Sequence, residues 1–107
     1  MASDPDAVER VRRCLAGRAD VVEQRMVGGL SFSVGGRMFC GIVGTALMVR
    51  VVSDGVGPAL AEPFVRPMEL GGRPLKAFVL VEPEGWADDA ALTAWVDRAL
   101  DVVARGA

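Results

Sequence analysis

Residues 30–43 carry the sequence LSFSVGGRMFCGIV, which predicts two strands joined by a tight turn. Leu30, Phe32 and Val34 alternate with two serines, the period-two pattern of a strand that buries one face. The glycine pair at 35–36 suits a two-residue hairpin, because both central residues of such a turn need a positive φ. A connection this short joins only antiparallel neighbours, so the stretch predicts an antiparallel sheet.

Further strands are predicted on both sides of this hairpin, separated by turns rich in glycine or proline. The strands expected in the whole chain are 21–27, 30–34, 37–43, 46–52, 64–70 and 76–81. The strand at 46–52 is largely apolar and is therefore expected in the middle of the sheet. Pro67 places the strand at 64–70 at an edge, because proline donates no hydrogen bond to a neighbouring strand.

Helices are predicted at both ends of the chain and once between the strands. The first begins at Asp4-Pro5, an N-cap followed by proline, and Gly17 ends it. A short helix begins at Pro58. The last helix begins at Asp88 and carries an apolar face at helical spacing, formed by Leu92, Trp95, Val96, Ala99, Leu100 and Val103. This order of elements predicts one α+β domain over residues 1–107, with two layers and helices flanking an antiparallel sheet.

The composition removes most catalytic chemistry. The 107 residues include no histidine, and Cys14 and Cys40 are the two cysteines. Without an imidazole there is neither a Ser-His nor a Cys-His pair, and two thiols cannot complete a structural zinc site. The composition therefore predicts no imidazole-based catalytic pair and no structural zinc site, and it favours a protein that is not an enzyme. Cys40 is expected to be a small buried apolar residue. Cys14 is expected to be inert; the alternative is a thiol whose pKa is lowered by Arg10, Arg13 and Arg18, about one helical turn away.

Net charge and hydropathy indicate a compact protein of the cytoplasm. The formal charge is −2, so no overall positive field favours nucleic acid. The longest uncharged run, between Arg37 and Arg50, has 12 residues and is too short to span a bilayer. The polar, acidic start lacks the pattern of a secretory leader. We therefore expect a cytoplasmic location, no membrane contact and reduced thiols.

Two glycine-containing turns carry cations. At residues 25–32, Gly28 and Gly29 form an anion-binding nest with Arg25 as counter-charge, or else a tight connection between strands. At residues 71–76, Arg73 and Lys76 lie close together on a turn that lacks the order of a phosphate-binding loop, so a solvated turn is the other explanation.

Charge is also uneven along the chain. Residues 24–53 hold three arginines and no acidic residue, whereas residues 82–107 hold six acidic residues and two arginines. This polarity suits pairing with a partner or a second copy, or serves solubility alone. Direct nucleic-acid binding would need six cations to converge on one face: Arg25, Arg37, Arg50, Arg66, Arg73 and Lys76.

Five segments together resemble the TfoX/Sxy N-terminal domain family. They are Arg25–Phe32, Gly36–Gly41, Leu47–Val51, Arg66–Leu70 and Gly72–Lys76. The resemblance extends over residues 8–103, and it rests on the order and spacing of the segments. Val27 stands where the family usually has Phe, and Leu75 where it usually has Met, which bears on packing detail.

The resemblance implies a two-layer α+β fold similar to that of secretion chaperones, with no catalytic residues and no cofactor. Full-length competence regulators of this family carry a second domain after this one. Because the sequence ends at Ala107, we expect a standalone N-terminal domain, to which the competence role does not simply transfer.

From these observations we expect a non-catalytic regulatory or adaptor domain that acts through protein contacts, as a homodimer and with a protein partner still to be named. The alternative is a transcription regulator that binds nucleic acid through the arginines of the sheet, which the net charge does not favour. A third hypothesis, a small enzyme that pairs Arg73 with Glu69 or Glu82, has no sequence pattern that gives two carboxylates a defined geometry.

Overall fold

The computed structural model describes residues 4–26, 28–51, 56–70 and 72–105, without the side chains of Val56, Leu70, Pro74 and Lys76. In chain order its elements are α1 (Pro5–Cys14), β1 (Val21–Met26), β2 (Gly29–Val34), β3 (Arg37–Val43), β4 (Ala46–Arg50), α2 (Val56–Leu60), β5 (Val65–Leu70), β6 (Arg73–Val81), the 3-10 helix η2 (Pro83–Trp86) and α3 (Asp89–Ala104).

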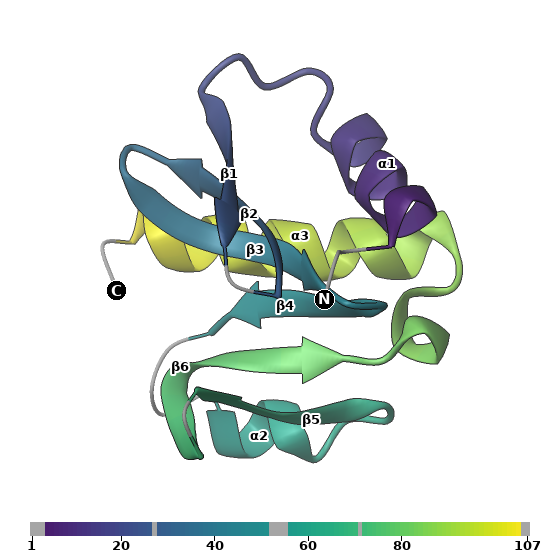
Figure 1. Ribbon diagram of the computed structural model, residues 1–107, viewed down its shortest axis with the longest axis vertical. Coiled ribbons are helices and arrows are strands. Elements are labelled where there is room, and N and C mark those ends of the chain that lie inside the picture. Colours follow the sequence, from purple (N-terminus) through teal and green to yellow (C-terminus); the bar gives the residue numbers. More distant parts are fainter. Residues whose placement is uncertain (1–3, 27, 52–55, 71, 106–107) are drawn as a thin grey trace.

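The strands form one sheet in the order β1-β2-β3-β4-β6-β5 (Figure 1). Every neighbouring pair is antiparallel, which confirms the α+β class predicted from the sequence. β4 lies inside the sheet, and β5, which contains Pro67, forms one edge, as predicted. β1 forms the other edge.

The turn between β2 and β3 has the expected backbone, with φ of 59° at Gly35 and 78° at Gly36. A bulge in the same hairpin was not predicted. Phe32 lies opposite Cys40, and the next residue of β2 lies opposite Met38, so Phe39 is an extra residue in β3. Phe39 and Cys40 are both buried in the same core cluster, a placement that a regular strand could not give to neighbouring residues.

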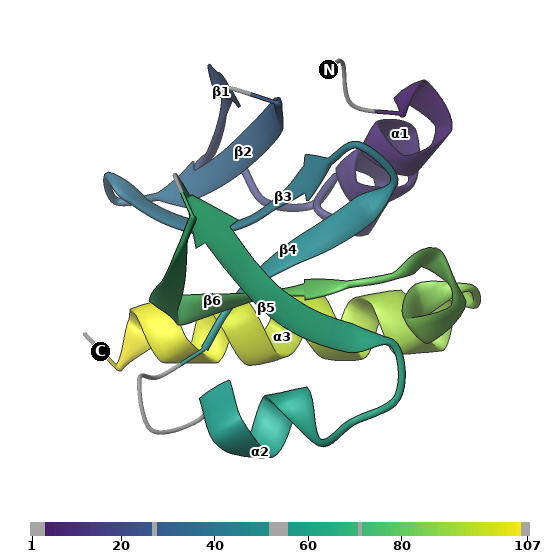
Figure 2. The same cartoon turned by 60° about the horizontal axis from the view of Figure 1, so that its bottom comes forward.

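One face of the sheet carries all three α-helices (Figure 2). The core on this face includes Val11 of α1, Ala59 of α2 and Val96 of α3, packed against strand residues such as Leu47 and Val79. The start of α3 is capped as expected, because the Asp88 carboxylate accepts a hydrogen bond from the Ala91 N–H at 2.7 Å.

The other face has a second apolar cluster built from strand residues. Its buried members are Ala46, Met48, Met68, Phe78 and Leu80. Met26 and Met38 pack against it from β1 and β3. Strands from both halves of the sheet thus contribute to one cluster that contains no helix residue.

Several predicted boundaries differ from the structure. Between β6 and α3, where no element was predicted from the sequence, residues 83–86 form η2; the indole of Trp86 is buried there and donates a hydrogen bond to the Val81 carbonyl at 3.0 Å. β6 begins three residues earlier than predicted, at Arg73, where it pairs with Leu70. α2 begins at Val56 rather than at Pro58. The ends of the predicted strands at residues 27 and 52 lie outside the described residues.

No helix within the described ranges is long and apolar enough to cross a membrane.

Candidate protein-interaction site

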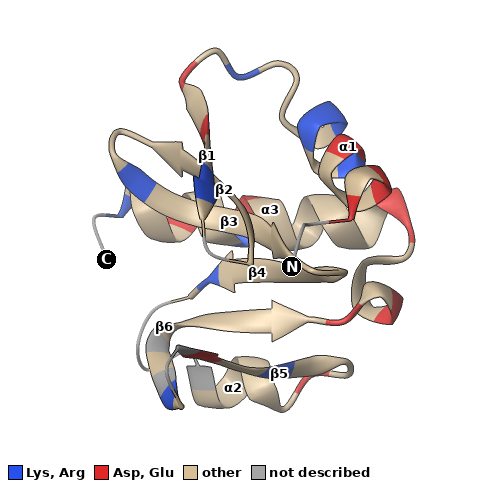
Figure 3. Ribbon diagram, in the orientation of Figure 1, with Lys and Arg blue, Asp and Glu red and all other residues tan. Residues whose placement is uncertain are grey.

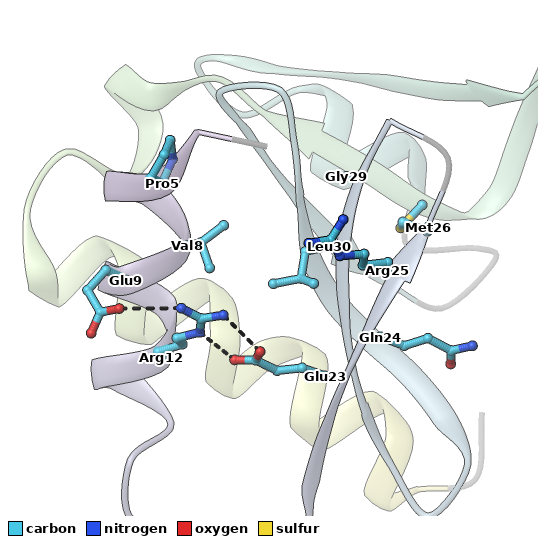
Figure 4. Close-up of a pocket in the computed structure, with 10 residues that line it drawn as sticks. All are labelled: Pro5, Val8, Glu9, Arg12, Glu23, Gln24, Arg25, Met26, Gly29 and Leu30. Carbon is cyan, nitrogen blue, oxygen red and sulfur yellow. Dashed lines mark hydrogen bonds and ion pairs between the residues drawn. The ribbon is translucent and has the colours of Figure 1, made fainter. Parts of the chain in front are cut away.

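A hollow of about 690 Å³ lies between α1 and the hairpin of β1 and β2 (Figure 4). Both elements contribute apolar and charged side chains to it. The residues that line it are Pro5, Val8, Glu9, Arg12, Glu23, Gln24, Arg25, Met26, Gly29 and Leu30. Two of the residues singled out in the sequence, Arg25 and Gly29, therefore lie at the same surface feature.

An ion-pair network crosses this hollow. Arg12 donates hydrogen bonds to both carboxylate oxygens of Glu23, at 2.6 and 3.0 Å, and its Nη1 lies 3.5 Å from Oε2 of Glu9. The hydrogen bonds from Arg12 lower the pKa of the Glu23 carboxyl below its ordinary value. Arg12 thus forms ion pairs with both Glu9 and Glu23, and these three side chains together carry a net charge of one negative unit.

Arg25 is the cation of the hollow that has no ion pair or hydrogen bond with a described residue. Figure 4 shows Glu23 and Arg25 on the side of β1 that faces α1 and Leu30, with Gln24 and Met26 on the opposite side. Because Arg25 is exposed, its charge is available to an acidic group of a partner.

The outer edge of β1 has no neighbouring strand in the described structure. Its side chains are mostly exposed, and Val22 has an exposed fraction of 61%. The Gln24 carbonyl faces β2, because it accepts a hydrogen bond from the Ser31 hydroxyl at 3.2 Å. Backbone groups alternate in direction along a strand, so the N–H and C=O groups of Glu23 and Arg25 point outward from the sheet.

The glycines at this hairpin have a structural explanation. Gly28 has a φ of +82°, which favours glycine. A Cβ atom on Gly29 would lie 2.0 Å from the Ile42 carbonyl oxygen of β3, closer than any real contact. The backbone of the turn therefore accounts for Gly28 and strand packing for Gly29, and neither residue requires a bound anion to explain it.

Another candidate cation, Arg50, lies at the sheet face that carries the second apolar cluster, which we call the helix-free face. The Arg50 guanidinium lies 5.2 Å from the centre of the Phe78 ring, and its Nη1 donates a hydrogen bond to the Met38 carbonyl at 3.0 Å. Its Nε is buried and has no hydrogen-bond partner within the described residues. Burial, and then the nearby charge of Arg37, lower the pKa of Arg50.

The remaining candidates are dispersed. Arg66 on β5 forms an ion pair with Glu82, and Arg73 is exposed at the turn between β5 and β6. The Lys76 side chain lies outside the described part of the chain. The positive residues of the strands extend along the sheet from β1 to the far edge (Figure 3). Arg25 lies on the α1 side, whereas Arg50 lies over Phe78 of the second cluster, so the candidate cations do not converge on one face.

The model of the TfoX N-terminal domain matches residues 13–103. The chain belongs to the TfoX N-terminal domain family. Searches of curated proteins and of solved structures gave no match. The match covers most of the sequence and agrees with the resemblance seen in the sequence and with the antiparallel sheet and flanking helices.

The TfoX N-terminal domain is not a known enzyme family. Of the two departures noted in the sequence, Leu75 packs half-buried against the second apolar cluster, and Val27 lies outside the described residues. Among the described residues, no group of three or more acidic or thiol side chains could hold a metal ion. Cys14 and Cys40 are free thiols, and burial raises the pKa of Cys40 far above its ordinary value.

Sequence reasoning missed Arg12 and Glu23 as site residues. They are 11 positions apart and lie on a helix and a strand, so no periodic pattern joins them. The signal that could have pointed to this site is a strand at the edge of the sheet with a cation beside it. The sequence does not reveal which strand lies at the edge, because that depends on the strand order.

Proposed function

We propose that this TfoX N-terminal domain is a non-catalytic regulatory or adaptor domain that acts through protein-protein contacts at the hollow and the outer edge of β1. The observation that carries the proposal is the open edge itself. Residues 21–26 have one strand neighbour, and Arg25, which lies beside that edge, has no internal ion pair. An exposed strand edge is a general template for binding another polypeptide.

The surrounding chemistry supports a protein partner. The hollow combines the apolar side chains of Val8 and Leu30 with the carboxylates of Glu9 and Glu23 and the free charge of Arg25. A mixed surface of this kind suits another protein better than a polyanion, because carboxylates next to the one free cation repel phosphate groups. A regulatory role in the cytoplasm is part of the proposal and is supported by the family and by two unpaired thiols.

Site-specific photo-crosslinking tests the proposal. A photoreactive residue replaces Gln24, which is exposed on β1, in cells that produce the protein. A matched control places it at Asp97, which is exposed on α3. We expect a protein adduct from position 24 that survives nuclease treatment and is absent from position 97. Equal labelling at both positions, or none at position 24, would refute a contact at this site.

Nucleic-acid binding is the second candidate, and the electrostatic influence of Arg37 on Arg50 is the observation in its favour. Burial, and after it the charge of Arg37, lower the pKa of Arg50, so the two cations contribute to one local positive potential. A DNA titration at several salt concentrations tests this candidate. Binding that weakens steeply with salt and is lost in Arg37→Ala supports it, and no binding at low salt refutes it.

A further inference from the structure

The two edges of the sheet differ in how they are protected. β5 contains Pro67, and its pairing with β6 is irregular between Pro67 and Glu69. Proline and bulges are devices that stop an edge from pairing with another chain. β1 has neither, because its register with β2 is continuous from Val21 to Met26. Of the two edges of the described sheet, β1 is therefore the regular one, with neither a proline nor a bulge.

The backbone restricts how a second strand could pair there. In an antiparallel pair of strands, a residue whose backbone N–H and C=O point toward the neighbouring strand lies opposite a residue of the same kind. A residue whose backbone groups point away lies opposite another such residue. Glu23 and Arg25 point their backbone groups outward, and Gln24 points its carbonyl toward Ser31. A second copy of β1 can therefore be centred on one residue of the strand, for example on Glu23, Gln24 or Arg25, but not between two residues.

Charge distinguishes these three registers. Centring on Glu23 places two carboxylates directly opposite each other, and centring on Arg25 places two guanidinium groups opposite each other. Like charges in such positions destabilise a sheet. Centring on Gln24 places Glu23 of each chain opposite Arg25 of the other, and the exposed Val22 opposite Met26. This register alone pairs opposite charges and covers an exposed apolar side chain.

The local charges strengthen this choice. In each chain Arg12 serves both Glu9 and Glu23, so the carboxylates are in excess, and Arg25 has no partner. Adding the Arg25 of a second chain beside Glu23 neutralises both. The side chains of the strand are thus self-complementary about a two-fold axis at Gln24.

The geometry points to self-association, in which two copies of the chain join the outer edges of their β1 strands, antiparallel and centred on Gln24, to form one continuous twelve-stranded sheet. This inference rests on the proposed function and names a second copy as the partner at that site.

Charges placed at Gln24 test the register, because only this register brings position 24 opposite itself. The mass of the protein is measured by light scattering or sedimentation over a range of concentrations. We expect the wild type to move from 11.3 kDa toward twice that mass as concentration rises. Gln24→Glu and Gln24→Lys should each weaken self-association about tenfold, and an equimolar mixture of the two should restore it.

Two further variants serve as a second test and a control. In the register centred on Gln24, Arg25→Glu places the new carboxylate of each chain opposite Glu23 of the other chain. These two repulsive pairs should also prevent dimer formation. Arg73→Glu makes the same charge change at the exposed turn of the far edge and should dimerise as the wild type does. Circular dichroism confirms that each variant is folded.

The outcomes separate this inference from the proposed function. A wild type that stays monomeric, Gln24 variants that dimerise like the wild type, or a mixture that does not recover overturns self-association at β1. If position 24 still crosslinks to a different protein in cells, the proposed function stands with another partner. If no adduct forms there, both fail.

Discussion

The Arg12 guanidinium of α1 donates two hydrogen bonds to the Glu23 carboxylate of β1, at 2.6 Å from Nε to Oε1 and at 3.0 Å from Nη2 to Oε2. This contact ties the first helix to a strand that otherwise has one neighbour. It also holds a carboxylate beside the outer edge of the sheet, where Arg25 is without a partner.

The Arg12–Glu23 pair predicts a stability effect that depends on pH. Because Arg12 lowers the pKa of Glu23 below its ordinary value of 4.5, the pair stabilises the fold above that pH and loses its effect as the pH falls through the lowered pKa. Glu23→Gln should therefore reduce the free energy of unfolding at neutral pH, and the difference from wild type should vanish in acid. Urea unfolding at both pH values measures it. Glu69→Gln, a change at an exposed carboxylate, is the control, and a difference for Glu23→Gln that does not depend on pH would contradict the assignment.

Replacing Gly29 by a residue with a side chain should destabilise the fold through a steric clash. A Cβ there would lie 2.0 Å from the Ile42 carbonyl oxygen, and strand backbone cannot move aside cheaply. Gly29→Ala should destabilise the fold by about 3 kcal/mol or more, as overpacking does. Gly17→Ala is the control, because no atom lies within 4 Å of its Cβ, and it should change stability by less than about 0.5 kcal/mol. Thermal unfolding compares the two, and equal effects would count against this explanation of Gly29.

Met48 tests whether the helix-free face is a packed core. Its side chain is fully buried between strands. Met48→Ala should cost about 2–5 kcal/mol through lost contacts and a cavity, whereas Met48→Leu should cost less than about 1.5 kcal/mol. Denaturant unfolding gives both values. A small loss for Met48→Ala would mean that the face is open rather than packed.

The two thiols should differ in reactivity. Burial raises the pKa of Cys40, so little thiolate forms, and reagents cannot reach it. Cys14 is half-buried, with its Sγ 3.8 Å from Oγ1 of Thr93. A thiol reagent should label Cys14 first in the native protein and both cysteines in urea, with mass spectrometry assigning the sites. Rapid native labelling of Cys40 would show that its strand opens.

Local sequence patterns predicted the elements well because each is decided by neighbouring residues. The glycine pair at 35–36 adopts the positive φ that its turn requires, and Asp88 caps the last helix through its own side chain. Pro67 marked an edge strand because its missing donor is a property of one residue.

Relations between distant segments could not be predicted in the same way. The insertion of β6 between β4 and β5 depends on packing across the whole sheet. The bulge at Phe39 breaks the alternation that identified the strand, and it lets two successive residues reach the same core. The meeting of Arg12 and Glu23 needs both the helix position and the strand order. For the same reason the six cations could be counted in the sequence, but not assigned to a common face.

Residue-resolved amide hydrogen exchange at increasing protein concentration tests the β1 contact most directly. The N–H groups of Glu23 and Arg25 point away from β2, whereas Gln24 faces β2. Pairing of two β1 strands predicts that exchange at Glu23 and Arg25 slows with concentration, while exchange at Gln24 changes far less. Exchange at Glu23 and Arg25 that is independent of concentration, or protection that appears at β5 instead, would contradict it.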